Sequence, residues 1–582
     1  MVIASTSELH HNEIRPIQVN GIELIVINLA GTISVFDGRC PHQGSLLSEG
    51  VLDEGVLTCR THGCRFSCIS GRSLSNSTSG LKRFNSVITN DQVKVDLAEI
   101  LAWHTERQPI DRYNVTAGTS SRSLEQLPGP KGIPIFGNAL QLHPSRMHLV
   151  FESWRRQFGP IYKYRVMNRP AIAIAEPALI SQVLRDRPET YRRWDGLETV
   201  VKEIGLDGII FTEGDTWRRQ RRIVSAAFRP ERLRSFSPVL SAITGRLLKR
   251  WEKEAVNERS IDILNDLTQY AAEVITSFTF GAGMGTARSD GEAIHRHLEI
   301  VFPMINRRSI APFPHWRYVK LPADRKLDRA MTSIRTLTAK LIASARSRLR
   351  QRAESDSHPT NVIEALLCAP ERLTDDEVLA NALSLLLAGE DTTANTISWI
   401  MYFLCRHPDV QMRLQSEVDS VAAAVGDADT LDAIDNLRYL DCVINETMRL
   451  KPVVPVSSFQ PINDIQLGGI SIPGGTMITL LTRDTSLYQD IGVDLHTFKP
   501  DRWLTGFNDV GNRRNFGFFP FGAGPRLCAG RNLALMEIKS VIVMLCRNFD
   551  VSLAKNECNV EETYGITMRP QGLHVRLRPR HK

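Results

Sequence analysis

The segment that decides the fold reads Phe521-Gly522-Ala523-Gly524-Pro525-Arg526-Leu527-Cys528-Ala529-Gly530. A single cysteine stands in a glycine-rich loop, and a helix is predicted directly after it, over residues 532–547. Glycines let such a loop pass close to a flat cofactor. Backbone N–H groups at the start of a helix can hydrogen-bond a thiolate and stabilise its charge. The segment therefore suits a cysteine that ligates the metal of a bound cofactor.

The segment contains the complete pattern F-x-x-G-x-R-x-C-x-G, and in this it resembles the haem-binding loop of the cytochrome P-450 family. The resemblance implies a mainly α fold with minor β-sheets over residues 127–582. It also implies haem b as the cofactor, with Cys528 as the ligand of the haem iron. The resemblance also implies that Phe521, Gly524, Arg526 and Gly530 contact the haem. Arg526 would do so by binding a propionate.

Two further motifs occur in the order that this resemblance requires. Trp217-x-x-x-Arg221 resembles the helix whose tryptophan and arginine bind the haem propionates. Glu446-x-x-Arg449 places a carboxylate and a guanidinium one helical turn apart, so that they can pair on one face. The resemblance adds Arg502 to this pair, as a structural ion-pair set behind the haem.

A long helix is predicted from Val378 to Leu404, because apolar residues recur there with helical period and Thr374-x-x-Glu377 forms a capping box before it. Near its middle stands the acid–alcohol pair Asp391-Thr392. The resemblance implies that this helix bulges over the haem to admit dioxygen. It also implies that Asp391 and Thr392 are catalytic residues that deliver protons.

One position departs from the family pattern. Members of the family often have an arginine after the Glu-x-x-Arg helix that binds a propionate, and alignment places Gln460 there. Haem anchoring is therefore expected to depend more on the other propionate ligands. Arg192 and Arg193 either lie in solvent or bind a carboxylate, and the sequence leaves both readings open.

Residues 40–62 contain a second metal-ligand pattern, Cys40-x-His42 and, after sixteen residues, Cys59-x-x-His62. Two thiolates and two imidazoles can bind tetrahedral zinc, or a 2Fe-2S cluster with both cysteines on one iron and both histidines on the other. Over residues 12–100 the chain resembles the Rieske family, which implies the cluster. The first loop has no second cysteine and no His-x4-His follows, so the likeness is to Rieske ferredoxins, which only carry an electron.

The chain is therefore predicted to be multidomain. Residues 1–107 contain short strands separated by turns and form a small all-β Rieske domain. Residues 108–126 are polar, with a glycine and five Ser or Thr, and are interpreted as a linker. Flexible coil of this length spans roughly 20–25 Å, enough for the small domain to reach the large one. Residues 127–582 form the haem domain.

Charge is distributed unevenly between these parts. Residues 1–106 hold eight basic and eleven acidic residues, a net charge of −3, and the remainder holds 63 basic and 53 acidic residues, a net charge of +10. An acidic small domain beside a basic large one is typical of electrostatic docking. Ordinary scatter of surface charge gives similar sums, so the sequence leaves both explanations open.

Composition excludes several classes of protein. Ten cysteines in 582 residues do not make a disulfide scaffold. No apolar run reaches the 18 or more residues that a membrane span needs. The first twelve residues do not resemble a secretory signal. We expect a cytoplasmic protein without a membrane span and without a nucleic-acid partner.

Together the two resemblances imply a self-linked monooxygenase. The Rieske cluster would pass electrons singly to a Cys-ligated haem, which activates dioxygen, the co-substrate, and inserts one oxygen atom into a small lipophilic substrate by hydroxylation or epoxidation. No flavin-binding or nicotinamide-binding motif is seen, so the reducing equivalents are expected from NAD(P)H through a separate flavoprotein, a ferredoxin reductase. The segments implied to line the substrate pocket are mostly apolar: parts of 194–210, 301–313, 385–388 and 453–459, and residues 566–567.

Two other classes of function stay open at this point. A haem-thiolate isomerase, dehydratase or peroxygenase would need no electron donor, and its Rieske domain would be regulatory. A redox or gas sensor would need an output domain. The intact ligand pattern at residues 40–62 and the Asp391-Thr392 pair favour the monooxygenase over both.

Overall fold

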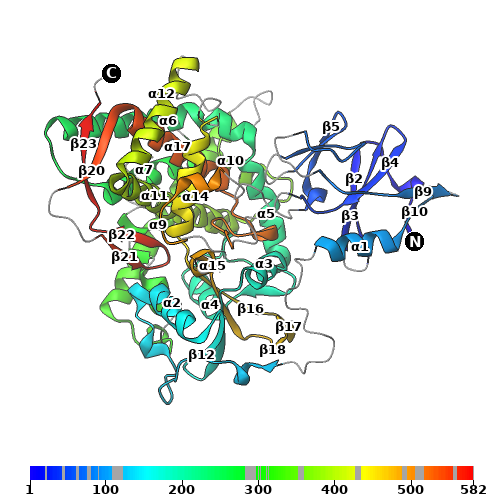
Figure 1. Ribbon diagram of the computed structural model, residues 1–582, viewed down its shortest axis with the longest axis horizontal. Helices are drawn as coiled ribbons and strands as arrows, with labels where there is room; N and C mark the ends of the chain where they lie inside the picture. Colours follow the sequence, from blue (N-terminus) through cyan, green and yellow to red (C-terminus); the bar gives the residue numbers. More distant parts are fainter. Residues whose placement is uncertain are drawn as a thin grey trace.

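The computed structural model describes residues 1–19, 22–41, 46–59, 64–74, 80–89, 91–107, 122–281, 296–298, 300–301, 303–309, 311, 313–351, 359–425, 434, 436–487, 495–504, 517–554 and 560–580. These residues form a small N-terminal domain of strands and a much larger, mainly helical domain beside it (Figure 1). The small domain lies next to α5 and α3 of the large one (Figure 1).

The N-terminal domain is built from three small antiparallel sheets, ordered β2-β3-β4-β8, β1-β10-β9 and β5-β6-β7. Its elements are β1 Val2–Ser5, β2 Glu13–Val19, β3 Ile22–Leu29, β4 Thr32–Asp37, β5 Val51–Asp53, β6 Val56–Thr58, β7 Arg65–Ser67, β8 Arg83–Phe84, β9 Ser86–Thr89, β10 Gln92–Val95 and α1 Leu97–Arg107. The all-β prediction is confirmed for residues 2–95, and α1 is an addition that the strand pattern did not indicate.

Strand β3 lies at the centre of the small domain, and both of its faces are buried. Leu24 and Val26 belong to one apolar cluster with β10 and α1. Ile25 and Ile27 point to the opposite face, because successive side chains alternate along a strand, and belong to a second cluster that contains Cys40 and Cys59. This second cluster fixes the two cysteine loops relative to each other.

The helices of the large domain are α2 Met147–Phe158, α3 Pro177–Arg185, α4 Asp195–Glu203, α5 Gly214–Ala227, α6 Pro230–Val256, α7 Ile263–Phe280, α9 Pro322–Gln351, α10 Val362–Leu367, α11 Asp375–Arg406, α12 Pro408–Val425, α14 Arg438–Leu450, α15 Thr482–Leu487 and α17 Arg531–Asn548. Its strands are β11 Arg122–Ser123, β12 Ile161–Val166, β13 Arg169–Ile174, β14 Tyr191–Arg193, β15 Ile261–Asp262, β16 Val456–Pro461, β17 Ile465–Leu467, β18 Ile470–Ile472, β19 Met477–Leu481, β20 Phe549–Leu553, β21 Glu561–Tyr564, β22 Met568–Gln571 and β23 His574–Pro579. None of the helices described here is both long and apolar enough to cross a membrane.

Helix α11 crosses the core of this domain. It begins as predicted, since the Thr374 side chain accepts from the Glu377 N–H and Glu377 accepts in return from the Thr374 N–H. The helix ends at Arg406, two residues beyond the predicted end. Most of its residues are buried, so it packs on several sides at once, against α7, α9, α14 and α17.

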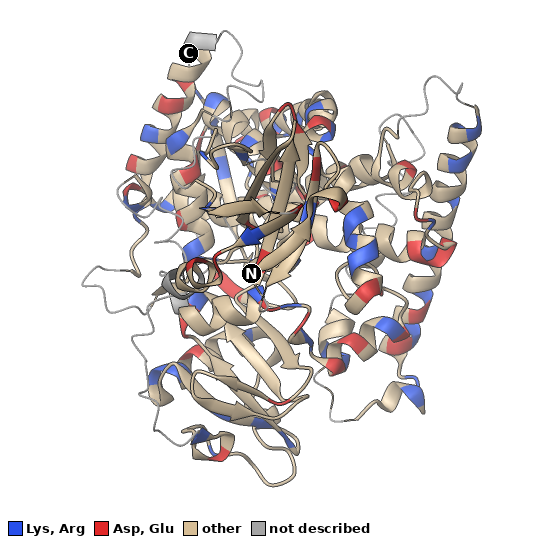
Figure 2. Ribbon diagram, turned by 90° about the vertical axis from the view of Figure 1, so that its right-hand side faces the viewer, with Lys and Arg blue, Asp and Glu red and all other residues tan. Residues whose placement is uncertain are grey.

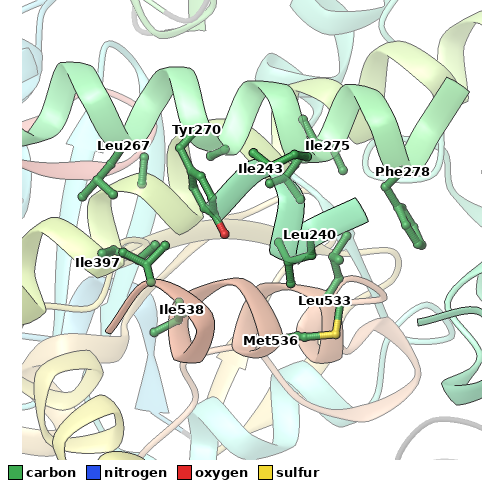
Figure 3. Close-up of a cluster of buried hydrophobic side chains, with 14 of the residues drawn as sticks. Leu240, Ile243, Leu267, Tyr270, Ile275, Phe278, Ile397, Leu533, Met536 and Ile538 are labelled. Atoms are coloured by element: carbon green, nitrogen blue, oxygen red, sulfur yellow. The ribbon is translucent and has the colours of Figure 1, made fainter. Parts of the chain in front are cut away.

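Helix α17, which was predicted after the cysteine loop, packs into the same core. Leu533, Met536 and Ile538 of α17 face Leu240 of α6 and side chains of α7 (Figure 3). These side chains are buried, and truncating a buried leucine costs about 2–5 kcal/mol, so the packing holds α17 firmly. The loop that ends at the first turn of α17 is therefore carried on a rigid element.

The main sheet of the large domain brings together strands that are far apart in sequence. Its order is β12-β13-β19-β16-β14. The antiparallel pairing of β14 with β16 sets Arg192 opposite Gln460 and Arg193 opposite Phe459. Strand β14 therefore lies beside Gln460, the position at which this chain lacks the arginine that the family often has.

The predicted linker is described only at its end. Residues 108–121 lie outside the described residues. Arg122 and Ser123 form β11, which pairs in parallel with β18, and residues 124–126 form a short 3-10 turn. The last five residues of the predicted linker are therefore attached to the large domain, at its small β11-β18-β17 sheet.

Candidate functional site

The Cys528 loop connects a short 3-10 turn, Gly524–Arg526, to α17. Gly524 has a φ of +69°, and a Cβ at this position would lie 2.6 Å from the Arg185 Cα at the end of α3. A Cβ at Gly530 would meet only Phe228 among the described residues, at 3.7 Å. Packing within the chain therefore requires glycine at 524 but not at 530.

Cys528 borders a cavity. The residue is exposed and lines this cavity together with Trp217 and Arg221. Burial nevertheless raises the pKa of the Cys528 thiol, while hydrogen bonds from the Gly530 and Arg531 backbone N–H groups and the charges of Arg221 and Arg531 act in the opposite direction. These groups stabilise a thiolate, which is the form of cysteine that binds a metal.

Three arginines gather beside the loop around one carboxylate, that of Glu213. The Arg187 Nη2 lies 3.3 Å from Glu213 Oε1, and Arg526 pairs with Glu213 Oε2. The Arg193 backbone N–H donates to Glu213 Oε1 at 3.0 Å. Burial lowers the pKa of Arg526 to about 9, and burial lowers the pKa of Arg187 and Arg193 too. The Arg193 guanidinium lies apart, since its Nε donates to the Ile210 carbonyl, and the Glu198 charge also acts on it. Two guanidinium groups on one carboxylate leave positive charge over beside the loop.

The tryptophan and arginine of α5 lie against the same loop. The Arg526 guanidinium lies over the Trp217 ring, 4.1 Å from the ring centroid. The Arg221 Nη2 donates to the Leu527 carbonyl at 2.7 Å. The structure therefore brings Trp217, Arg221, Arg526 and Cys528 together, as the resemblance implied.

A second group of buried charged side chains joins α14 to residues 499–503. Glu446 is fully buried, and five donors surround its carboxylate at 2.9 Å: Arg449 Nε and Nη2, Arg502 Nε, the Lys499 backbone N–H and Trp503 Nε1. Both carboxylate oxygens are therefore filled by donors from α14 and from residues 499–503.

Asp391 and Thr392 are held in different ways on α11. The Thr392 hydroxyl donates to the Ala388 carbonyl at 2.7 Å. The Asp391 Oδ2 accepts from the Thr567 hydroxyl at 3.0 Å. Thr567 lies between β21 and β22, so the carboxylate is tied to a hairpin, and the neighbouring hydroxyl is tied to its own helix.

The cysteines of the N-terminal pattern lie together in the small domain. Cys40 and Cys59 are buried in one apolar cluster. A hydrogen bond with Cys40 is the main cause that lowers the pKa of the Cys64 thiol, so Cys64 also adjoins the pair. Cys64 and Cys68 are buried in the same cluster, as expected of packing residues. His42 and His62 lie outside the described residues.

Both domains line the cavity at the cysteine loop. Leu46 and Glu49 of the small domain face Trp217, Arg221, Cys528 and Arg531 of the large one. The Glu49 charge acts on Arg221, and the Arg531 charge acts on Cys64. Burial raises the pKa of Asp186 and the charges of Arg185 and Arg39 oppose it, so Arg39 also lies close across the boundary. The flanks of both cysteine loops therefore face α3, α5 and α17 around Cys528.

Comparison with protein families agrees with this geometry. The cytochrome P-450 family model matches residues 127–577, which is most of the chain. The chain belongs to the cytochrome P-450 family. The Rieske 2Fe-2S domain model matches residues 1–84, so the protein is a fusion of a Rieske domain with a P-450 monooxygenase domain. The two resemblances drawn from the sequence are confirmed.

The similar proteins are P-450 enzymes from distant organisms. Cytochrome P-450 3A6 of Oryctolagus cuniculus is 28% identical over 454 residues, which cover 75% of this chain and 89% of the relative. Cytochrome P-450 734A5 of Oryza sativa subsp. japonica is 27% identical, over 74% of this chain and 81% of the relative. The self-sufficient cytochrome P-450 monooxygenase CYP505E5 of Aspergillus kawachii is 25% identical, over 78% of this chain and 43% of the relative.

The P-450 assignment implies haem b, and the residues around Cys528 fit this cofactor. Haem b carries two negatively charged propionates, and more guanidinium than carboxylate charge lies beside Glu213. The Nε atoms of Arg187 and Arg526 are buried and have no acceptor among the described atoms. A Cys528 thiolate, Trp217 and Arg221 complete a set that can hold an iron and two carboxylates. These residues would hold the haem.

Sequence reasoning missed Arg187 and left Arg193 undecided. Arg193 is not in solvent, because its Nε donates to the Ile210 carbonyl at 2.6 Å. Arg187 is 4% exposed and its guanidinium lies over the Phe459 ring, 4.3 Å from the centroid. Gln460, one residue on, accepts instead from the Asp195 N–H. An arginine from the segment before α4 thus lies beside the position where the family often has its arginine, and a motif search cannot see this.

We predict that Arg187→Met weakens haem binding. The loss of one charge-assisted hydrogen bond, worth about 1.5–3 kcal/mol, lowers affinity by about 10–100-fold. The measurement is the rate at which the protein gives up its haem to excess apomyoglobin. Arg192→Met is the matched control, because Arg192 pairs with Glu198 and not with this group. Equal haem loss from both variants would contradict a specific role for Arg187.

Proposed function

We propose that this P-450 monooxygenase is self-linked to its electron donor, and that it oxidises a small lipophilic substrate by hydroxylation or epoxidation. When bound, the haem supplies dioxygen activation, using electrons that the 2Fe-2S cluster hands over one at a time. The observation that carries the proposal is the shared cavity, in which Glu49 and Leu46 of the Rieske domain face Arg221 and Cys528. The ligand loop of one centre is thereby presented to the ligand loop of the other.

Charges across the domain boundary support this orientation. Arg39 directly precedes Cys40 and acts on Asp186 at the end of α3. Glu49 acts on Arg221 in the middle of α5. Opposite charges that meet on both sides of the predicted ligand loop fix its orientation, because any rotation of the domain would separate at least one pair. The tether keeps the two domains at high effective concentration, so these pairs need only orient the encounter.

The proposed source of electrons is a flavoprotein in trans. A nicotinamide delivers a hydride, which is an electron pair, whereas a 2Fe-2S cluster takes up one electron. A flavin accepts hydride and can release the electrons singly, so a ferredoxin reductase that uses NAD(P)H is the class of partner that the cluster needs. We place the reaction in the cytoplasm, where such a reductase and its NAD(P)H are available.

The segments that the P-450 resemblance assigns to the substrate pocket support a lipophilic substrate. Their described and buried members include Leu206, Ile209, Val301, Ile305 and Leu385. Arg308, the buried charged residue described within these segments, is paired, since its guanidinium donates to Asp324 at 2.8 Å. A pocket lined in this way binds apolar surface and offers little to a sugar or a phosphate.

Asp391 and Thr392 are proposed as the proton-delivery pair. The Thr392 hydroxyl can release its bond to the Ala388 carbonyl and become free to donate a proton, and Asp391 can resupply that proton. A general acid acts only within hydrogen-bond reach, so the position of the carboxylate decides how well the pair works.

Cys528→His tests the ligand of the haem iron. The variant should lose the strongly red-shifted absorption band that a reduced, carbon-monoxide-bound thiolate haem shows, because imidazole donates less charge to the iron. Absorption spectra of the reduced protein with and without carbon monoxide measure this. Cys546→Ala is the control, since Cys546 is buried within α17 away from the loop. A red-shifted band in Cys528→His would exclude Cys528 as the ligand.

Charge reversal across the boundary tests the electron path. Arg39→Asp and Asp186→Arg should each slow the reduction of the haem by a pre-reduced cluster by roughly 5–30-fold, the effect of losing about 1–2 kcal/mol. The double variant should recover most of this loss, because the pair is restored with opposite polarity. Stopped-flow absorbance at low salt measures the rate.

His62→Ala provides the complementary test. It should abolish turnover driven by the reductase and leave the haem spectrum and peroxide-driven turnover intact. Wild-type turnover by this variant would mean that the haem receives its electrons from another donor, and that the Rieske domain has a regulatory role.

Thr392→Ala tests proton delivery. The variant should bind substrate with unchanged affinity and divert reducing equivalents to hydrogen peroxide, because the hydroxyl that supports proton transfer is gone. Peroxide formed per NAD(P)H consumed is the readout, and Thr393→Ala is the neighbouring control. Unchanged coupling in Thr392→Ala would indicate a reaction that does not consume dioxygen in this way.

A further inference from the structure

Three side chains on one face of α11 bind a single short segment between β21 and β22. Asp391, Asn395 and Trp399 stand at successive steps of four residues, so they lie above one another on the helix. Asp391 Oδ2 accepts from the Thr567 hydroxyl at 3.0 Å, and the Asn395 Nδ2 donates to the same hydroxyl oxygen at 3.2 Å. The Trp399 Nε1 donates to the Met568 carbonyl at 3.3 Å. The middle of α11 is thus attached by polar bonds to residues 567 and 568 of the β21–β22 hairpin.

The hydrogen bonds at Thr567 have a fixed direction. A hydroxyl carries one proton and can donate once. The amide nitrogen of Asn395 can only donate, so it occupies a lone pair of the Thr567 oxygen. The single Thr567 proton is then left for the carboxylate of Asp391. Asn395 therefore orients the hydroxyl, and the hydroxyl holds the carboxylate.

The side chains that form these hydrogen bonds, apart from the Asp391 carboxylate, are enclosed by protein. Asn395 is fully buried, Thr567 is 5% exposed and Trp399 is 1% exposed. Hydrogen bonds shielded from water are stronger and hold their geometry better than exposed ones. A buried polar chain that ends on a half-buried aspartate controls where that aspartate points.

We propose that Thr567 is a positioning residue for Asp391. Its hydroxyl, oriented by Asn395, holds the Asp391 Oδ2 against the β21–β22 hairpin and fixes the carboxylate in the arrangement from which it delivers protons. The inference rests on the proposed role of Asp391 and deepens it, since it assigns the control of that role to a residue far away in the sequence. Displacing a proton-transferring group by about 1 Å can cost a rate factor of about 100, so such control has a large effect.

The test compares Thr567→Val, which keeps the shape and removes the hydroxyl, with Thr567→Ser, which keeps the hydroxyl. The holoenzyme is supplied with a ferredoxin reductase and NAD(P)H. The probe is the member of a panel of medium-chain fatty acids, monoterpenes and steroids that the wild type oxidises fastest. Product and peroxide per NAD(P)H consumed and the solvent deuterium isotope effect on turnover are measured at saturating probe.

We expect Thr567→Val to lower product per NAD(P)H by roughly 3–10-fold, to raise peroxide correspondingly and to enlarge the solvent isotope effect, because proton transfer becomes slower. In Asn395→Ala, which lies outside the segments assigned to the substrate pocket, probe affinity measured by the change of the haem spectrum should stay within about twofold. Thr567→Ser should recover coupling. Asn395→Ala removes the donor that orients the hydroxyl, so it should act in the same direction as Thr567→Val, and it serves as the second variant where Thr567→Val folds poorly.

Trp399→Phe is the matched structural control. It loosens the same hairpin by removing the bond to the Met568 carbonyl, keeps an aromatic ring, and leaves Asp391 and Thr567 in place. Coupling in Trp399→Phe should stay at the wild-type value. Uncoupling equal to that of Thr567→Val would show that hairpin packing is responsible and would overturn the inference, as would wild-type coupling in Thr567→Val or failure of Thr567→Ser to recover it.

Asp391→Asn, measured alongside, distinguishes a failure of the proposed proton delivery from a failure of the inference about Thr567. If Asp391→Asn turns over and couples like the wild type, the proposed proton delivery by Asp391 fails, and the inference fails with it. If Asp391→Asn is impaired while Thr567→Val is not, only the inference about Thr567 fails.

Discussion

A buried charge is costly unless opposite charge meets it, and this constraint organises the haem domain. Glu446 meets it completely, because donors fill both of its carboxylate oxygens. The group therefore needs nothing from outside the chain, and it locks α14 to residues 499–503. Arg449 and Arg502 share the Glu446 carboxylate, and further N–H groups of both arginines donate to backbone carbonyls. Glu213 is the opposite case, since Arg187 and Arg526 share its carboxylate but the Nε atoms of both arginines have no acceptor among the described atoms. A group whose donors are satisfied within the chain is scaffold, and a group with donors to spare is suited to an anionic ligand.

The sequence alone could predict those parts of the site that depend on neighbouring residues of one loop or helix. Cys528, Trp217-x-x-x-Arg221 and Glu446-x-x-Arg449 act through neighbours on one loop or helix, so local spacing identifies them. The limits of α11 follow from a capping box and helical periodicity, which are also local. Arg187 lies before β14, and the fold brings it against Phe459 of β16, which a single sequence does not show. For the same reason the glutamine at 460 indicates a missing cation, although a cation from another segment lies against the neighbouring Phe459.

The domain boundary shows a second limit of sequence arithmetic. An acidic N-terminal part and a basic remainder indicate docking between an acidic and a basic face. The structure instead has pairs of both polarities, with Arg39 of the small domain near Asp186 and Glu49 of the small domain near Arg221. Figure 2, which looks onto the N-terminal domain, likewise shows basic and acidic residues interspersed along the long helices. Net charge draws domains together, whereas individual pairs of mixed polarity decide the orientation.

Helix α11 shows how one element can serve both stability and chemistry. Adjacent residues of an α-helix point about 100° apart, so Asp391 and Thr392 cannot share a partner even though they act together. The structure gives each its own: the hydroxyl is bound within the helix to Ala388, and the carboxylate is bound to a hairpin from the end of the chain. The residues that do the chemistry can therefore be recognised from their motif. Thr567 and Asn395, which we propose to position the Asp391 carboxylate, belong to no sequence motif, because their role depends on which surface packs against the helix.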